Sequence, residues 1–163
     1  MNDFKRKLML RESVSRLHSA EVLRTAGDES DSAYLLELLG FELLLKIVYE
    51  LRTGQAPPKH HRYAEIYGNL PALTQEELLR LTGERIGPSA LSTDPTAVLT
   101  ELGNNFIHLR YPYDKYAGMT QDEYERSGDE WIQRGARNEE AVFRYFPEEL
   151  FGLTESVKQI AGC

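Results

Sequence analysis

Residues 33–52 read AYLLELLGFELLLKIVYELR, the most apolar stretch of this chain. Glu42, Lys46 and Glu50 recur there every fourth residue, so a helix collects them on one narrow polar stripe. Apolar residues cover most of the remaining circumference, and such a helix must be buried nearly all round. The charges are too frequent for a membrane-spanning helix, which needs about 20 predominantly apolar residues. The pattern therefore predicts a core helix over residues 31–52.

The segments on either side of this stretch also have helical patterns. Further helices are predicted over residues 4–26, 63–70, 74–81, 95–110 and 138–160, the last one broken or kinked at Pro147, with a short helix at residues 121–126. Thr74 and Glu77 have the spacing of a capping box, and Asp94-Pro95 is typical of a helix start. Residues 83–93 predict a loop, and the tyrosine-bearing residues 113–137 predict an extended cover over neighbouring helices. The expected fold class is all-α, an up-and-down helical bundle of about five to seven helices.

Length and composition limit the class of protein. The 163 residues suffice for one domain, expected over residues 1–163 with a C-terminal extension at residues 113–163. With 19 basic and 26 acidic residues the formal charge is −7, which argues against a broad DNA-binding surface. The single cysteine, Cys163, cannot form an internal disulfide, which favours a reducing compartment. No targeting or membrane segment is visible, so we expect a cytoplasmic protein without membrane contact.

Residues that could carry chemistry gather at the end of the 95–110 helix. Asn104 and His108 are one turn apart and Tyr111 follows three residues later, so all three side chains could face one cleft. A histidine can move a proton near neutral pH, and Arg110 can hold a phosphate with a planar fork of donors. The alternatives are a structural role for His108 and a helix-capping role for Arg110.

Several pieces occur in an order that resembles the HEPN domain superfamily. They are the Leu-rich helix over residues 33–52, His60-His61 in the next loop, Asn69-Leu70-Pro71, and Arg110-Tyr111-Pro112. The resemblance covers residues 8–114. It implies an up-and-down helical bundle, commonly a homodimer, with polar helix ends meeting in a cleft between protomers.

The ribonucleases of this superfamily carry an arginine, a spacer of four to six residues and a histidine, and they cleave RNA without metal. Counting back from His108, the arginine would stand at Gly103, Leu102 or Glu101, and none of these is arginine. The nuclease motif is therefore broken. Loss of the group that stabilises developing charge typically costs about two to three decades in rate.

Many members of the superfamily with the Arg-Tyr-Pro triplet lack the ribonuclease motif, and a nucleotide-binding role is proposed for the family. The resemblance implies phosphate contacts from His108, Arg110, Lys59, His61 and Arg62, and a base stacked on Tyr111 or Tyr113. The alternative for the two tyrosines is that they only pack and cap. His60 and His61 are adjacent and point in different directions, so neither a metal nor a cofactor is expected.

Three functions are compatible with these residues. The favoured one is a HEPN-like module that holds nucleotide or RNA phosphate in a dimer cleft, with weak or no nuclease activity. The second is a metal-independent endoribonuclease of a toxin-antitoxin or defence system, with His108 in proton transfer, Arg110 as a displaced phosphate clamp and Asn104 in support. The third is a non-catalytic domain that assembles with a protein partner, suggested by the acidic charge and by the broad apolar face of the 31–52 helix. The fold alone does not choose among the three.

Overall fold

The computed structural model describes residues 3–162, so Cys163 lies outside the described residues. The α-helices are α1 (Asp3–Thr25), α2 (Ser32–Thr53), α3 (Tyr63–Gly68), α4 (Ala72–Ile86), α5 (Pro95–His108), α6 (Gln121–Gln133) and α7 (Pro147–Ala161). Three short 3-10 helices, η1 (Ala90–Ser92), η2 (Pro112–Lys115) and η3 (Asn138–Glu140), lie between them. Residues 3–162 contain no strand, and the predicted all-α bundle is confirmed.

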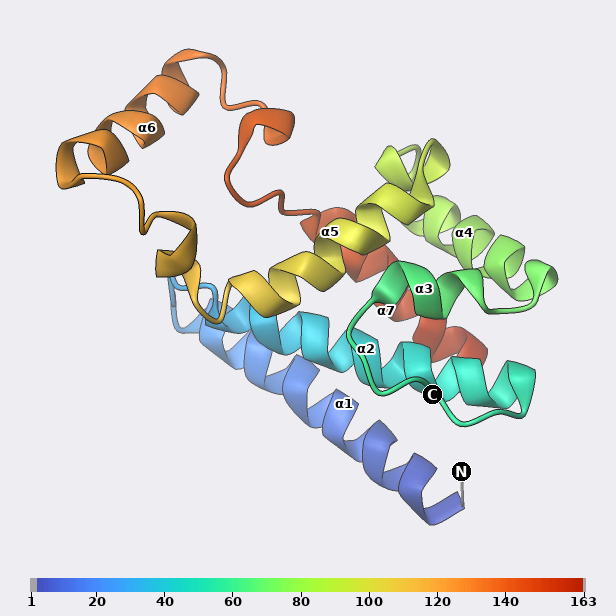
Figure 1. The fold of residues 1–163 in the computed structure, drawn as a ribbon. Helices are drawn as coiled ribbons and strands as arrows, with labels where there is room; N and C mark the ends of the chain where they lie inside the picture. The colour runs from blue at the N-terminus through green and yellow to red at the C-terminus, as the bar shows by residue number, and fades with distance from the viewer. Residues whose placement is uncertain (1–2, 163) are drawn as a thin grey trace.

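Helix α2 is the centre of the bundle. It contacts α1, α3, α5 and α7 (Figure 1). Leu38, Phe41 and Leu44 on α2 are fully buried, and even Glu42 from the polar stripe is only 4% exposed. The prediction of a helix covered nearly all round is confirmed, because neighbours cover both its apolar sides and part of its polar stripe.

Helix α1 lies alongside α2 (Figure 1), and a glycine sets their spacing. A Cβ atom added at Gly40 would lie 2.8 Å from the Cγ atom of Leu17, so only glycine allows this approach. Arg24 and Glu37 form an ion pair across the same two helices. The predicted bounds of both helices agree with the structure to within one residue, since helix periodicity and the turn at Gly27 are local signals.

Helix α5 begins as the sequence predicts. The side chain of Asp94 accepts a hydrogen bond from the backbone N–H of Ala97 at 2.9 Å, and Pro95 occupies the first helical position. The helix ends at His108, two residues before the predicted end. It packs against α3 and α2, which places its C-terminal half beside the loop that leads into α3.

The prediction for α4 is wrong at both ends. The helix begins at Ala72, directly after Pro71, and Thr74 lies inside it with no capping bond and only 4% exposure. It continues to Ile86, four residues into the predicted 83–93 loop, because Gly152 of α7 lets Thr82 pack closely against α7: a Cβ atom at Gly152 would lie 2.8 Å from Thr82. Burial against a helix far away in sequence extends α4.

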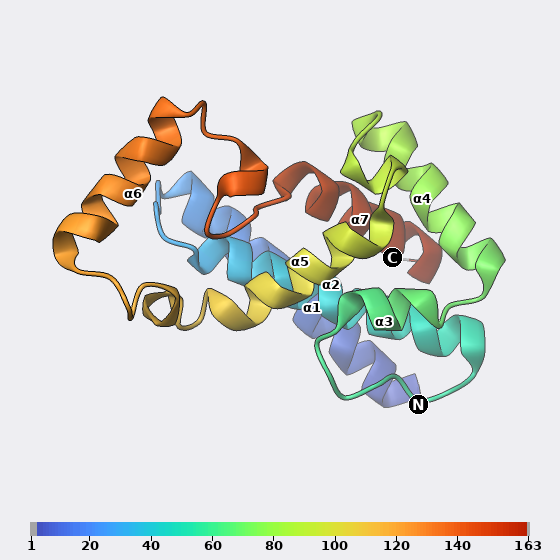
Figure 2. The same cartoon turned by 45° about the horizontal axis from the view of Figure 1, so that its top comes forward.

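Residues 111–142, here named the outer segment, do not cover the bundle as predicted. Not one of them is buried, and α6 stands apart from the other helices in both views (Figures 1 and 2). Helix α6 begins at the predicted residue 121, where the Thr120–Glu123 capping box starts it, but it continues to Gln133 instead of ending at residue 126. The predicted break at Pro147 is confirmed, because α7 begins there and packs against α2 and α4. The helix predicted before the break is wrong, since residues 138–146 contain only the 3-10 helix η3.

Candidate functional site

Two segments distant in sequence enclose a hollow of about 240 Å³ beside α5, here named the α5 hollow. The loop before α3 contributes His61 and Arg62, and α5 contributes Asn104. The other lining residues are Tyr63, Ala64, Glu65, Thr100, Gly103 and Ile107. Three of the residues chosen from sequence therefore line one concave surface.

A buried carboxylate fixes the ring of His61. The Nδ1 atom of His61 lies 2.7 Å from Oε2 of Glu42, and the Lys46 ammonium lies 2.7 Å from Oε1 of the same carboxylate. Because an ionised carboxylate only accepts hydrogen bonds, Nδ1 of His61 is the donor and Nε2 is the nitrogen left for another partner. Burial of the Glu42 charge is tolerated because two basic groups pair with it.

Phe106 joins His61 to Arg110. The ring centroids of His61 and Phe106 are 4.7 Å apart, and the guanidinium carbon of Arg110 lies 4.9 Å from the centroid of Phe106. The contact with Arg110 is a cation–π interaction, which holds the guanidinium without neutralising it. Arg110 is exposed, and within residues 3–162 no carboxylate forms an ion pair with it.

The Arg62 guanidinium has a competing partner at the rim of the hollow. Its Nε atom lies 3.0 Å from Oε2 of Glu65, and His60 lies 3.2 Å from Oε1 of the same carboxylate. An anion entering the hollow must compete with Glu65 for Arg62. Within residues 3–162 no carboxylate pairs with Nε2 of His61, and this nitrogen donates to an anion when the ring is protonated.

The remaining predicted residues lie outside the α5 hollow. His108 is half-buried at the end of α5 and does not line the hollow, and Lys59 is exposed in the loop before α3. Tyr111 and Tyr113 are 52% and 64% exposed, with their ring centroids 6.2 Å apart. Asn104, His108 and Tyr111 thus do not line a common concave surface.

Gly103 allows the loop and α5 to meet. A Cβ atom at this position would lie 2.7 Å from the backbone oxygen of His61 and 3.4 Å from the backbone nitrogen of Tyr63. Both neighbours are backbone atoms, so a side chain at position 103 needs a shift of the loop. The α5 hollow depends on this contact.

Tyr63 packs under the α5 hollow as a neutral phenol. Its ring lies edge-on to Phe41, and its hydroxyl donates to the backbone oxygen of Leu38 at 3.2 Å. Burial raises the pKa of Tyr63 well above its usual value, and the nearby Glu42 carboxylate raises it further. Tyr63 therefore supports the floor of the site and does not titrate near neutral pH.

Glu42 and Phe106 are the site residues that sequence reasoning missed. Phe106 has the spacing of a core residue, and only the fold places its ring between two basic side chains. Glu42 did carry a signal, since a carboxylate on a helix buried nearly all round needs a basic partner. Lys46, one turn later, supplies one partner locally, and the second, His61, comes from another loop.

Within residues 3–162 no group of three or more His, Cys, Asp or Glu side chains could hold a metal ion. Over the same range, none of the helices combines the length and the apolar character that crossing a membrane requires. Comparison with known proteins finds no matching family model, no matching curated protein and no matching solved structure.

Proposed function

We propose that this chain is a HEPN-like module that binds the phosphate of a nucleotide or of RNA at the α5 hollow, without efficient cleavage. The observation that carries the proposal is the convergence of His61, Arg62 and Asn104 on one hollow. Arg110 contacts the same Phe106 ring as His61 does. The guanidinium and amide groups donate hydrogen bonds to phosphate oxygens, and His61 does so through Nε2 when its ring is protonated, because its Nδ1–H is already donated to Glu42.

The size of the α5 hollow fits the phosphate rather than the whole nucleotide. A space of about 240 Å³ falls below the range of about 300–1,000 Å³ that is usual for sites of drug-sized ligands. The sugar and base would then lie outside it, towards the helix end. The exposed rings of Tyr111 and Tyr113 offer stacking surfaces there, and Lys59 adds a positive charge in the loop.

The three positions where the family arginine would stand all have other structural roles. A side chain at Gly103 would collide with the backbone of His61. Leu102 is fully buried, and Glu101 lies 3.7 Å from Arg144. An arginine at position 102 or 103 would disturb packing, and one at position 101 would replace the ion pair with Arg144 by a contact between like charges, which supports binding over efficient cleavage.

A second copy of the chain is part of the proposal. The resemblance implies a cleft between two protomers, and the rim of the α5 hollow carries Ile107, which is 41% exposed. Tyr111 and Tyr113 extend this exposed apolar surface at the end of α5. A symmetric pair of such ends would enclose the phosphate from both sides.

The test measures the binding of a fluorescein-labelled single-stranded RNA by anisotropy, with nucleotides as competitors and light scattering for the mass. Arg110→Ala is expected to weaken binding by about tenfold or more, since it removes a charge-assisted contact. Arg80→Ala on α4 is the matched control, because Arg80 is also exposed and forms its ion pair with Glu84, away from the α5 hollow. Unchanged binding in both variants would refute the proposal.

Two other results would favour the alternative functions. Cleavage of RNA in the presence of a chelator, lost in His108→Ala, would make the chain a metal-independent ribonuclease. A stable dimer that binds no nucleotide or RNA, and whose melting temperature no such ligand raises, would make it an assembly module.

A further inference from the structure

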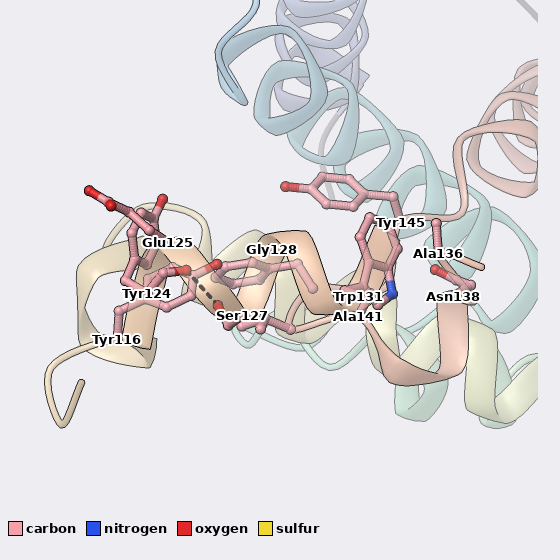
Figure 3. A pocket seen from close by; sticks show the side chains of 12 residues that line it. Tyr116, Tyr124, Glu125, Ser127, Gly128, Trp131, Ala136, Asn138, Ala141 and Tyr145 are labelled. Atoms are coloured by element: carbon pink, nitrogen blue, oxygen red, sulfur yellow. Dashed lines mark hydrogen bonds between the residues drawn. The ribbon is translucent and has the colours of Figure 1, made fainter. Parts of the chain in front are cut away.

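A second and larger cavity, of about 540 Å³, opens where the outer segment meets the bundle (Figure 3). Five aromatic residues line it, and it is named the aromatic pocket here. They are Tyr116, Tyr124, Trp131, Phe143 and Tyr145. The aromatic pocket shares no residue with the α5 hollow, so the two can be tested separately.

The aromatic rings form two groups that face a common space. Figure 3 shows Tyr116 and Tyr124 at one end of the aromatic pocket and Trp131 and Tyr145 at the other. The Tyr116 ring centroid lies 4.8 Å from that of Tyr124 and 6.3 Å from that of Phe143, and both pairs are edge-on. These contacts hold Tyr116 as the link between the outer segment and the bundle.

The polar ends of the other two rings are already engaged. The indole Nε1 of Trp131 donates to the backbone oxygen of Arg137 at 2.8 Å, and the Tyr145 hydroxyl donates to Asp31 at 2.7 Å. With those donors occupied, Trp131 and Tyr145 offer a ligand mainly their ring surfaces. An aromatic ring face carries negative partial charge and attracts cations.

The charges around the aromatic pocket favour a cation as well. Glu125 is the only charged residue in its lining, and within residues 3–162 it pairs with no basic group, accepting only from the Gln121 amide at 2.9 Å. The rest of α6 is acidic: Asp122, Glu123, Asp129 and Glu130 outnumber Arg126. An anionic ligand such as a nucleotide would be repelled here.

Two tyrosines of the aromatic pocket, Tyr116 and Tyr145, stay neutral near physiological pH. Burial, with the hydrogen-bonded Asp31 carboxylate, raises the pKa of Tyr145, and burial raises that of Tyr116. Neutral phenol rings line the walls, and the only formal charge is the carboxylate of Glu125.

We propose that the aromatic pocket binds an alkylated ammonium ion, of the quaternary kind found in choline and in trimethyllysine. Such a cation is weakly hydrated compared with a primary ammonium and fills an aromatic box with its methyl groups. Glu125 supplies the compensating charge at the rim. This function is additional to phosphate binding and uses none of its residues.

The chain provides its own reporter for the test. Trp131 is the only tryptophan, so its fluorescence follows occupancy of the aromatic pocket directly. The full chain is titrated with choline and with 3,3-dimethyl-1-butanol, which has the same shape without the charge. We expect a saturable change with choline and affinity about tenfold or more above that of the neutral alcohol.

Variants then locate the binding. Tyr124→Leu removes a wall that is 52% exposed, and Glu125→Gln removes only the charge; each is expected to weaken choline binding about threefold to tenfold. Phe151→Leu on α7, 59% exposed and outside the aromatic pocket, should change nothing. Circular dichroism checks that Tyr124→Leu remains folded, and Glu125→Gln tests the charge independently of that result.

Two further ligands are tested. A trimethyllysine peptide shows whether the cation belongs to a protein or to a small molecule, and adenosine shows whether the pocket prefers a ligand other than a cation. A trimethyllysine peptide that binds more tightly than both choline and its unmodified lysine form would show that the cation belongs to a protein tail. Choline binding that exceeds peptide binding would point to a small molecule. Equal affinity for choline and the neutral alcohol, or tighter binding of adenosine, would overturn the proposal.

Discussion

The helical bundle and the outer segment are built by different means. In the bundle, α2 is surrounded by four helices, and Leu44 is fully buried at its centre. In the outer segment no residue is buried, and α6 is held by contacts close in sequence, such as the Thr120–Glu123 capping box and the bond from Trp131 to Arg137. Long-range burial therefore determines the bundle, and local hydrogen bonds determine the shape of the outer segment.

The sharpest test of this contrast replaces one apolar residue in each region. Leu44→Ala should lower the free energy of unfolding by about 2–5 kcal/mol, because it leaves a cavity in the core. Ile132→Ala on α6, at a site 65% exposed, should change it by less than about 0.5 kcal/mol. Urea denaturation measures both, and equal losses would mean that the outer segment packs as the bundle does.

Two glycines inside helices should respond with opposite sign. Gly103→Ala in α5 should cost about 1–3 kcal/mol of folding free energy, since its Cβ would lie 2.7 Å from the backbone of His61. At Gly128 in α6 a Cβ has open space, so Gly128→Ala should stabilise that helix by about 0.5–1 kcal/mol. Thermal melting measures the effect of Gly103→Ala, and amide exchange within α6 measures that of Gly128→Ala. Effects of the same sign would contradict the difference between the two regions.

Removing a helix cap should affect global stability in the bundle but only local stability in the outer segment. Asp94→Ala removes the cap of α5 and should lower the global free energy of unfolding by about 1 kcal/mol. Thr120→Ala removes the cap of α6 and should cost that helix a similar amount, seen as faster amide exchange in residues 121–133. Its effect on the global transition should be negligible; a global loss as large as that of Asp94→Ala would show the two regions to be coupled.

The smallest expected effect is a pH dependence confined to α6. Hydrogen bonds from the backbone and side chain of Thr120 hold the pKa of Glu123 below its ordinary value of 4.5. A lowered pKa in the folded state means that Glu123 stabilises α6 fully above pH 4.5, and that this contribution fades as the pH falls through the lowered value. Amide exchange in α6 from pH 6 to about pH 3 would record the loss, and Glu123→Gln should remove this pH dependence.

The same contrast explains how much of the fold can be predicted from the sequence. The bounds of α1, α2 and the start of α5 follow from local signals: helical periodicity, the turn at Gly27 and the Asp94-Pro95 pair. The length of α4 does not, because Gly152 of α7 decides how far its last turn can pack. The position of the outer segment was equally out of reach, since exposed and covered tyrosines have the same local pattern.

The candidate site shows the same limit. His61, Arg62 and Asn104 are each visible as polar residues in the sequence, but their meeting depends on the approach of the loop to Gly103. The pairing of His61 with Glu42 joins positions 19 residues apart, which neither periodicity nor motif spacing specifies. Residue types can therefore be chosen from sequence, whereas their partners come from the packing.

The chain leaves the bundle after α5 and returns to it as α7, which lies against both α2 and α4. A protease that cuts within the exposed residues 117–137 would sever the backbone there without touching that packing. The two fragments would then migrate as one particle on size exclusion and separate only in denaturant. The packing of α7 against α2 and α4 would thus hold the cut chain together without the covalent link. In a cut or split chain, the fragment that carries α7 could be replaced by an added copy of the same fragment.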